Sequence, residues 1–346
     1  MAHNLTNIPN REVIVDGKPY LYFGGTAYLG VQDYPPFKQL FLQQMEQCGL
    51  QYGASRKSNI SLDVYAKAES HLVNWVGSEA CLTMSSGYLA AQLLIQTYLK
   101  QGHSLFATPN SHIALHTQGV TKVNSIASIK EKLLSEIDQG NTPVILFDTI
   151  DFEDDLFPNF DALQQLPMEE VILIGDDSHG IGVVGETGNG AYEKLKVLNP
   201  AKLMVCCSLG KALGIQAGAI FGDEEDIQVL KNTGFFGGAS PASPAFMGTL
   251  LDAQDIYSER LAKLRINHAT FKEHLKHPQF FNHLDGHPSF EFTNASIAKT
   301  LEAEGFLFTN FRYPDESGPL VSRIVLSAYH QKEDILKLVN CINSLV

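Results

Sequence analysis

Two strand ends in this sequence carry residues that could do chemistry. Lys211 stands between glycines in "SLGKALG", directly after an apolar run typical of a buried strand, and lysine is seldom fully buried. Its amine could form an imine with a carbonyl compound, although a surface lysine at a strand end would look the same. Asp176 and His179, in "IGDDSHG", also follow an apolar run. They could face one ligand together, or belong to a solvated turn in which His179 caps a carbonyl.

Two further stretches could hold a ligand. Ser85, Ser86 and Gly87 immediately precede an apolar helical stretch, where the free N–H groups and the positive helix end suit a phosphate. A serine N-cap would explain the same residues without a ligand. His112 and His116 lie four apart on a possible helix, and one exposed and one core histidine is the plain account of that pair.

Together these features predict a site for pyridoxal phosphate. That cofactor needs a lysine for an imine, a carboxylate to keep its pyridine nitrogen protonated, a phosphate cradle and a group against its ring. The chain supplies a phosphate-binding turn, a stacking residue, a strand-end aspartate and a strand-end lysine, in that order. No CxxC spacing and no convincing ligand set appears, so neither a disulfide framework nor a metal site is expected.

The elements that must position these residues follow one rhythm. Apolar runs of the strand type recur at "HSLFAT", "PVILFDT", "VILIGDD", "KLMVCCS" and "GAIFG", separated by helical or loop stretches. This alternation predicts an α/β fold with a mostly parallel sheet and helices on both faces. Acidic and hydroxyl side chains follow several of these strands, where open α/β sheets gather ligand groups. Cys206 and Cys207 should point to opposite faces of their strand as small buried residues.

The remainder of the chain predicts a smaller α+β part. A hairpin is expected in "EVIVDGKPYLYF", followed by helices near 35–48 and 62–76, the second of which should stop at Gly77. After "FFGGASPASPAF" the strand rhythm ends, and residues 241–274 predict one long helix. We expect three parts, listed by residue: an N-terminal segment 1–50 that packs with the small domain, a large cofactor-binding domain 51–240, and a linking helix with the small domain 241–346.

Composition narrows the class of partner. The chain has 346 residues, 44% of them apolar, and a net charge of −13, which argues against binding nucleic acid or an anionic membrane. No apolar run approaches the roughly 20 residues of a membrane helix, and the polar N-terminus is unlike a signal peptide. A soluble, cytoplasmic protein without a membrane span is therefore expected.

The ordered motifs resemble the α-oxoamine synthase family, the class II, aminotransferase-like branch of fold-type I pyridoxal phosphate enzymes. "AYLG" resembles the family's N-D-Y-L-G, and "DDSHGIGVVGETGNG" is similar to its D-[DE]-[ST]-H-G-x-G-x-x-G-x-x-G-x-G signature. "SLGKALGIQAGAI" resembles the family's lysine motif, and "SRIVLSAYHQKEDI" its C-terminal arginine motif. The likeness runs from about Tyr20 to the C-terminus, and implies a fold-type I transferase with a mostly parallel sheet and a small α+β C-terminal domain.

The resemblance implies a role for each cofactor-site residue. Lys211 would form the internal imine, Asp176 would bind the pyridine nitrogen and His179 the phenolic oxygen. His112 would stack on one ring face while Ser178 packs on the other, and His112, Asp176, His179 and Lys211 would form the catalytic set.

Phosphate and substrate contacts are implied in the same way. Ser86, Gly87 and Tyr88 would hold the phosphate with help from Ser208. Ser240 would reach the phosphate of a neighbouring subunit, which implies an obligate homodimer.

The substrate side departs from the family pattern. Arg323 would pair with the amino acid's carboxylate, a task suited to a planar guanidinium. Thr26 stands where the family has a substrate-contacting asparagine. Ile60 and Tyr65 stand where the family has a glycine and a histidine, and "IDFEDD" (150–155) replaces S-M-D-G.

The leading hypothesis is a biosynthetic acyltransferase that condenses an amino acid with an acyl-CoA or an acyl carrier protein thioester. Arg56, Lys57 and Arg312 are candidates for the basic patch that a CoA phosphate would need, or plain solvated charges. The alternative is an aminotransferase, a decarboxylase or an aldolase-type enzyme on the same cofactor. A cofactor-binding protein without turnover is a third hypothesis.

Overall fold

The computed structural model describes residues 3–151, 156–313 and 316–345, which form two compact units. The central unit spans Gln39–Gln254, and the terminal unit combines the chain up to Lys38 with the chain from Asp255 onward. Residues 50 and 240, where the sequence suggested domain ends, both lie in the central unit. Within the described ranges, no helix is both long and apolar enough to cross a membrane.

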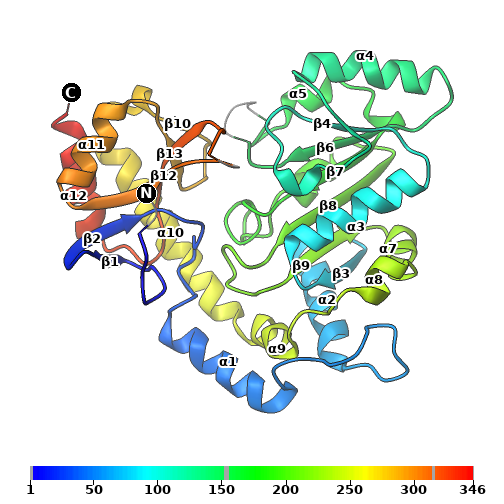
Figure 1. Cartoon of the computed structure of the whole chain (residues 1–346), viewed down its shortest axis with the longest axis horizontal. Coiled ribbons are helices and arrows are strands. Elements are labelled where there is room, and N and C mark those ends of the chain that lie inside the picture. The colour runs from blue at the N-terminus through cyan, green and yellow to red at the C-terminus, as the bar shows by residue number, and fades with distance from the viewer. Residues whose placement is uncertain (1–2, 152–155, 314–315, 346) are drawn as a thin grey trace. The chain divides into compact units, whose positions relative to one another are not determined.

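The central unit is built on one sheet with the strand order β3-β9-β8-β7-β6-β4-β5 (Figure 1). Pairing is parallel from β8 to β5, and only β9 runs antiparallel to its neighbours β8 and β3. The predicted, mostly parallel sheet is therefore confirmed. The strand bounds are β3 Ala80–Met84, β4 Leu105–Ala107, β5 Val120–Lys122, β6 Val144–Asp148, β7 Ile172–Asp176, β8 Lys202–Ser208 and β9 Gly218–Gly222.

Both faces of this sheet are covered. One face joins Leu146, Ile174 and Cys206 in a buried cluster with Leu94 of helix α3 (Gly87–Lys100). On the other face, the ring of Phe147 and Leu195 of helix α6 (Tyr192–Lys196) lie over Gly175. Cys206 and Cys207 are both free and fully buried, as the strand alternation predicted.

The other helices of the central unit follow local signals. Helix α2 (Asp63–Val76) ends at Gly77, whose φ of 84° is the left-handed conformation that favours glycine. The remaining elements are α4 Ile126–Ile137, α5 Asp161–Gln164, α7 Glu224–Lys231, α8 Gly234–Gly238 and α9 Pro244–Asp252, with the 3-10 turns η1 Ile113–Leu115 and η2 Met168–Glu170. Helix α1 (Pro35–Cys48) begins in the terminal unit and continues into the central one.

Two helix predictions are wrong. The single helix expected over 241–274 is two helices, α9 and α10 (Gln254–His274). Helix α9 starts late because the residue before a proline avoids the helical conformation, and Ser243 before Pro244 has an extended ψ of 131°. His112 and His116 do not share a helix, since they flank the single 3-10 turn η1.

The terminal unit contains the second sheet, in the order β1-β2-β12-β13-β11-β10. Asp16 and Gly17, with φ of 51° and 78°, form the tight turn of the predicted hairpin between β1 and β2. Only β2 and β12 pair in parallel, and the other pairs are antiparallel. The bounds are β1 Glu12–Val15, β2 Lys18–Phe23, β10 Asn282–His283, β11 Ser289–Glu291, β12 Phe306–Arg312, β13 Leu320–Val325, α11 Ala295–Ala303, α12 Lys332–Asn343 and the 3-10 turn η3 Pro278–Phe280.

Candidate active site

The predicted cofactor residues of the central unit gather where its parallel strands end. In the sheet register Asp148, the last residue of β6, pairs with Asp176, the last residue of β7, which in turn pairs with Cys206 of β8. Asp176 is 7% exposed, and one carboxylate oxygen accepts the backbone N–H of Ser178 at 2.9 Å. The carboxylate is thereby oriented at the edge where α/β sheets bind ligands.

Lys211 and His179 lie in direct contact. The lysine Nζ and the histidine Nε2 are 3.0 Å apart, although the residues come from the turns after two different strands, β8 and β7. Both side chains are half-buried. The structure therefore unites the lysine motif with the Asp-x-x-His motif, as the sequence predicted.

The predicted phosphate cradle is a close contact between two chain segments. Ser86 caps α3, because its Oγ accepts the N–H of Leu89 at 3.2 Å. A Cβ on Gly87 would lie 2.7 Å from the Cβ of Ser208 and 2.8 Å from its backbone nitrogen, so only glycine fits. Ser208 in turn donates its N–H to the Oγ of Ser178 at 2.8 Å. The positive N-terminus of an apolar helix is thus held against the end of β8, a geometry that suits an anion.

Tyr88 and Ser240 occupy more open positions. Tyr88 is the second residue of α3 and is 53% exposed. Ser240 is exposed in the segment after α8. Their predicted roles toward a phosphate in the same or in a neighbouring subunit stay predictions.

His112 is held in a defined orientation by Asp148, a residue that the sequence reasoning missed. The backbone N–H of His112 donates to the Asp148 carboxylate at 2.8 Å, and the His112 Nδ1 accepts the N–H of Ala114 at 3.1 Å. Burial and the nearby Lys211 lower the pKa of the His112 ring against the opposing effect of Asp176. Burial and Asp176 also raise the pKa of Asp148 well above its usual range.

The second aspartate of the "DDSHG" motif has a structural task. Asp177 accepts the hydroxyl of Thr149 at 2.5 Å and the N–H of Ala191 at 3.0 Å, and burial raises its pKa to about 7. A Cβ on Gly180 or on Gly190 would collide with this carboxylate. Asp177 therefore fastens the glycine-rich turn that carries His179.

The predicted substrate residues lie in the terminal unit. Arg323 of β13 donates its Nε to Glu291 Oε1 of β11 at 2.8 Å, and its Nη2 donates to the same oxygen. Thr26 lies in the loop after β2, beside Gly25, whose N–H donates to Thr309 Oγ1 at 3.2 Å. Sequence reasoning did not find Glu291, and its acidic type within a short strand was the only available signal.

Of the three cations predicted for a CoA phosphate, Arg56 is instead paired with side chains inside the protein. Its guanidinium contacts Glu69 at 3.0 Å and the Thr83 hydroxyl at 3.1 Å, and the Arg56 and Glu69 side chains are only 13% and 9% exposed. Lys57 is exposed, with its Nζ 3.4 Å from a backbone carbonyl oxygen. Arg312 is exposed and donates to the carbonyl of Gly318 at 2.8 Å.

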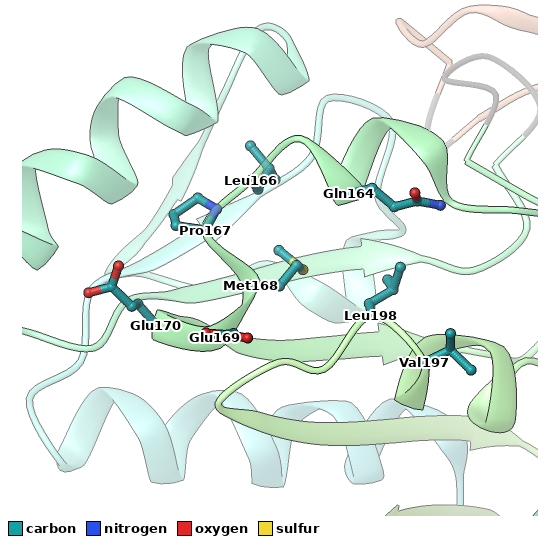
Figure 2. A pocket seen from close by; sticks show the side chains of 8 residues that line it. All are labelled: Gln164, Leu166, Pro167, Met168, Glu169, Glu170, Val197 and Leu198. Atoms are coloured by element: carbon teal, nitrogen blue, oxygen red, sulfur yellow. The ribbon is translucent and has the colours of Figure 1, made fainter.

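Two features lie apart from the strand-end cluster. A pocket of about 610 Å³ is lined by the segment just before β7 and by two residues after α6. Figure 2 shows the lining residues: Gln164, Leu166, Pro167, Met168, Glu169, Glu170, Val197 and Leu198. None of these is a predicted site residue. Of the departure "IDFEDD", residues 152–155 lie outside the described residues, and the described Asp151 is 5% exposed.

The fold is that of the fold-type I pyridoxal phosphate enzymes. The structure is similar to Sphingomonas wittichii serine palmitoyltransferase, with a TM-score of 0.83, 17% identity and coverage of 99% of this chain and 91% of the other. It is also similar to 8-amino-7-oxononanoate synthase of Francisella tularensis, with a TM-score of 0.72, 18% identity and coverage of 94% and 97%.

The chain belongs to the aminotransferase class I and II family, whose family model matches residues 27–342. Among relatives, 8-amino-7-oxononanoate synthase of Geobacter sulfurreducens is 26% identical over 94% of this chain and 89% of that protein. The synthase of Aliivibrio fischeri strain MJ11 is 28% identical over 96% and 91%. These relatives confirm the predicted resemblance to the α-oxoamine synthases.

Proposed function

We propose that this protein is a pyridoxal phosphate-dependent transferase that condenses an amino acid with an acyl thioester in a biosynthetic pathway. The observation that carries the proposal is the contact of Lys211 Nζ with His179 at 3.0 Å, beside the strand-end Asp176. The named synthase relatives, which match nearly the whole chain, support the same reaction class.

The described residues fit pyridoxal phosphate. The cradle between Gly87 and Ser208 leaves no room for a side chain, and the first-turn amides of α3 are suited to a phosphate. When bound, the cofactor supplies an electron sink that stabilises negative charge on the α-carbon of an amino acid. Lys211 would be its attachment point, and Asp176 would keep its pyridine nitrogen protonated.

The protein's own side chains then orient and move protons. The Nζ of Lys211 would accept the α-proton of the amino acid, and His179, 3.0 Å away, would keep that amine in place. His112, anchored through its backbone to Asp148, would hold the cofactor ring together with Ser178. Arg323 receives the carboxylate of the amino acid.

Assembly and acyl donor follow from the family resemblance. Ser240 reaches the phosphate of a second subunit in a homodimer. The acyl group comes from CoA or from an acyl carrier protein, and the exposed Lys57 and Arg312 are the remaining candidates for its phosphate. The protein acts in the cytoplasm.

A first experiment tests cofactor attachment. Purified protein loaded with pyridoxal phosphate should absorb in the visible range, and borohydride should bleach this band by reducing the imine to a stable secondary amine. Lys211→Ala should abolish the visible band. Lys122→Ala, at an exposed position of β5, should leave it unchanged. A wild-type protein that takes up no cofactor would overturn the proposal.

A second experiment identifies the reaction. A screen of amino acids with acyl-CoA thioesters should release free CoA, measured with a thiol reagent, only when both substrates are present. Keto acid formation that needs a second keto acid would assign an aminotransferase, and amino-acid loss without thioester would assign a decarboxylase or an aldolase-type enzyme. These reactions are included because Thr26 stands where the family has a substrate-contacting asparagine. Cofactor uptake without any response to amino acids would indicate a binding protein without turnover.

A further inference from the structure

The arginine predicted to bind the substrate carboxylate already has an acidic partner. In the sheet of the terminal unit, Arg323 lies between Thr309 of β12 and Glu291 of β11 in direct cross-strand register. Directly opposed residues share a face of an antiparallel sheet, so these three side chains form a row. Two guanidinium nitrogens of Arg323 donate to one oxygen of Glu291.

This row lies on the face of the sheet away from its aromatic core. Phe290, next to Glu291 and therefore on the other face, packs against Phe271 of α10 with ring centroids 4.5 Å apart and the rings tilted by 48°. On the side of the row, the loop after β2 lies against Thr309, because the N–H of Gly25 donates to the Thr309 Oγ1 at 3.2 Å. The same loop carries Thr26, the other predicted substrate residue.

The pair is largely removed from water. The Arg323 and Glu291 side chains are 19% and 20% exposed. The ring of Tyr28 is fully buried nearby, and its pKa is raised to about 12 by burial while Arg323 acts in the opposite direction. A carboxylate in such a place destabilises the protein when it loses its cationic partner. The net charge of the row is zero, because Arg323 balances Glu291.

We propose that Glu291 is a specificity-determining residue that selects amino acids with a hydrogen-bond donor on the side chain, a hydroxyl or an ammonium group. The inference rests on the proposed function, in which the substrate carboxylate binds Arg323. A carboxylate that binds the edge of Arg323 formed by Nε and Nη2 shares or displaces the Glu291 oxygen, which leaves the Glu291 carboxylate in need of a donor. Serine supplies a hydroxyl and 2,3-diaminopropionate an ammonium, whereas alanine supplies neither, and aspartate adds a further negative charge.

The physical basis is the asymmetry of buried polar groups. A site built to hydrogen-bond a substrate group rejects the analogue that lacks it, because the protein group is then left unpaired. Replacing the Glu291 carboxylate by an amide of the same shape removes the unpaired charge. The preference for serine over alanine and aspartate should then decrease, because no unpaired charge remains.

The test is the dissociation constant of each amino acid for cofactor-loaded protein, measured by calorimetry without an acyl donor. Wild type should bind serine and 2,3-diaminopropionate at least tenfold more tightly than alanine, and aspartate most weakly. Glu291→Gln should narrow the serine-to-alanine ratio to less than threefold. Glu302→Gln, at an exposed glutamate of α11, should keep the wild-type ratio.

The outcomes separate the two proposals. Equal affinity for serine and alanine in the wild type, or an unchanged ratio in Glu291→Gln, would overturn the role of Glu291 while leaving the proposed function intact. Absence of binding by every amino acid would overturn both. Visible absorbance of the bound cofactor in each variant shows that the cofactor site has folded.

Discussion

Replacing Gly87 by alanine should weaken cofactor binding. The new methyl group would lie 2.7 Å from the Ser208 Cβ and 2.8 Å from the Ser208 Cα and nitrogen. Two of these three atoms are backbone atoms of a central strand, so no rotation of a side chain relieves the contact. The first turn of α3 must move away from β8, and the phosphate cradle between them must open.

The magnitude follows from the cost of overpacking. An extra methyl group in a tightly packed place costs about 1–3 kcal/mol. If that strain is relieved at the expense of the phosphate contacts, the dissociation constant of pyridoxal phosphate rises by about 5- to 150-fold, since about 1.4 kcal/mol is a factor of ten. Without the close contact, alanine should instead stabilise the helix by about 1 kcal/mol relative to glycine.

Gly234→Ala is the matched control. Gly234 is also the first residue of its helix, α8, and follows a hydroxyl N-cap, Thr233, as Gly87 follows Ser86. A Cβ on Gly234 would meet no atom within 4 Å. Titration of the cofactor-free protein with pyridoxal phosphate, followed by absorbance, should give a wild-type constant for Gly234→Ala. Wild-type affinity and raised stability to urea in Gly87→Ala would refute the reasoning.

Three further predictions concern stability. Glu69→Gln leaves the buried Arg56 without its charged partner, so the free energy of unfolding in urea should fall by about 3–5 kcal/mol, and a change below about 1 kcal/mol would contradict a structural role. Burial lowers the pKa of His330 to about 4 from an ordinary value of 6.5. Because the folded pKa lies below the unfolded one, the neutral ring's contribution is complete above about pH 6.5 and is lost as the pH falls toward 4, a loss on the order of 3 kcal/mol. His330→Asn should show a flatter fall in unfolding free energy between pH 7 and pH 4.5. Gly190→Ala, at a φ of 81° and against the Asp177 carboxylate, should lower the melting temperature by several degrees and speed proteolysis of the glycine-rich turn, whereas an unchanged melting temperature would show that the turn can relax.

Most of the local structure could be predicted because its causes are local. The helix stop at Gly77 depends on one left-handed residue, and the helix start at Ser86 depends on one hydroxyl cap. The convergence of Asp176 and Lys211 was also predictable, because parallel strands bring their carboxyl ends to one edge of a sheet. The same reasoning failed over 241–274, where the restriction imposed by Pro244 and the break at Ala253 divide the expected helix.

What the sequence determined by itself was therefore the alternation of strands and helices in the central unit and most of the groups at the strand ends, among them Asp176 and Lys211. Only the tertiary structure decided which partner each group has. Asp177 turns to Thr149 while its neighbour Asp176 stays at the sheet edge, and Glu291 joins Arg323 from a strand that lies 32 residues earlier. Such pairs depend on which strands lie side by side and on which face each residue falls, and neither is encoded in the spacing of a motif.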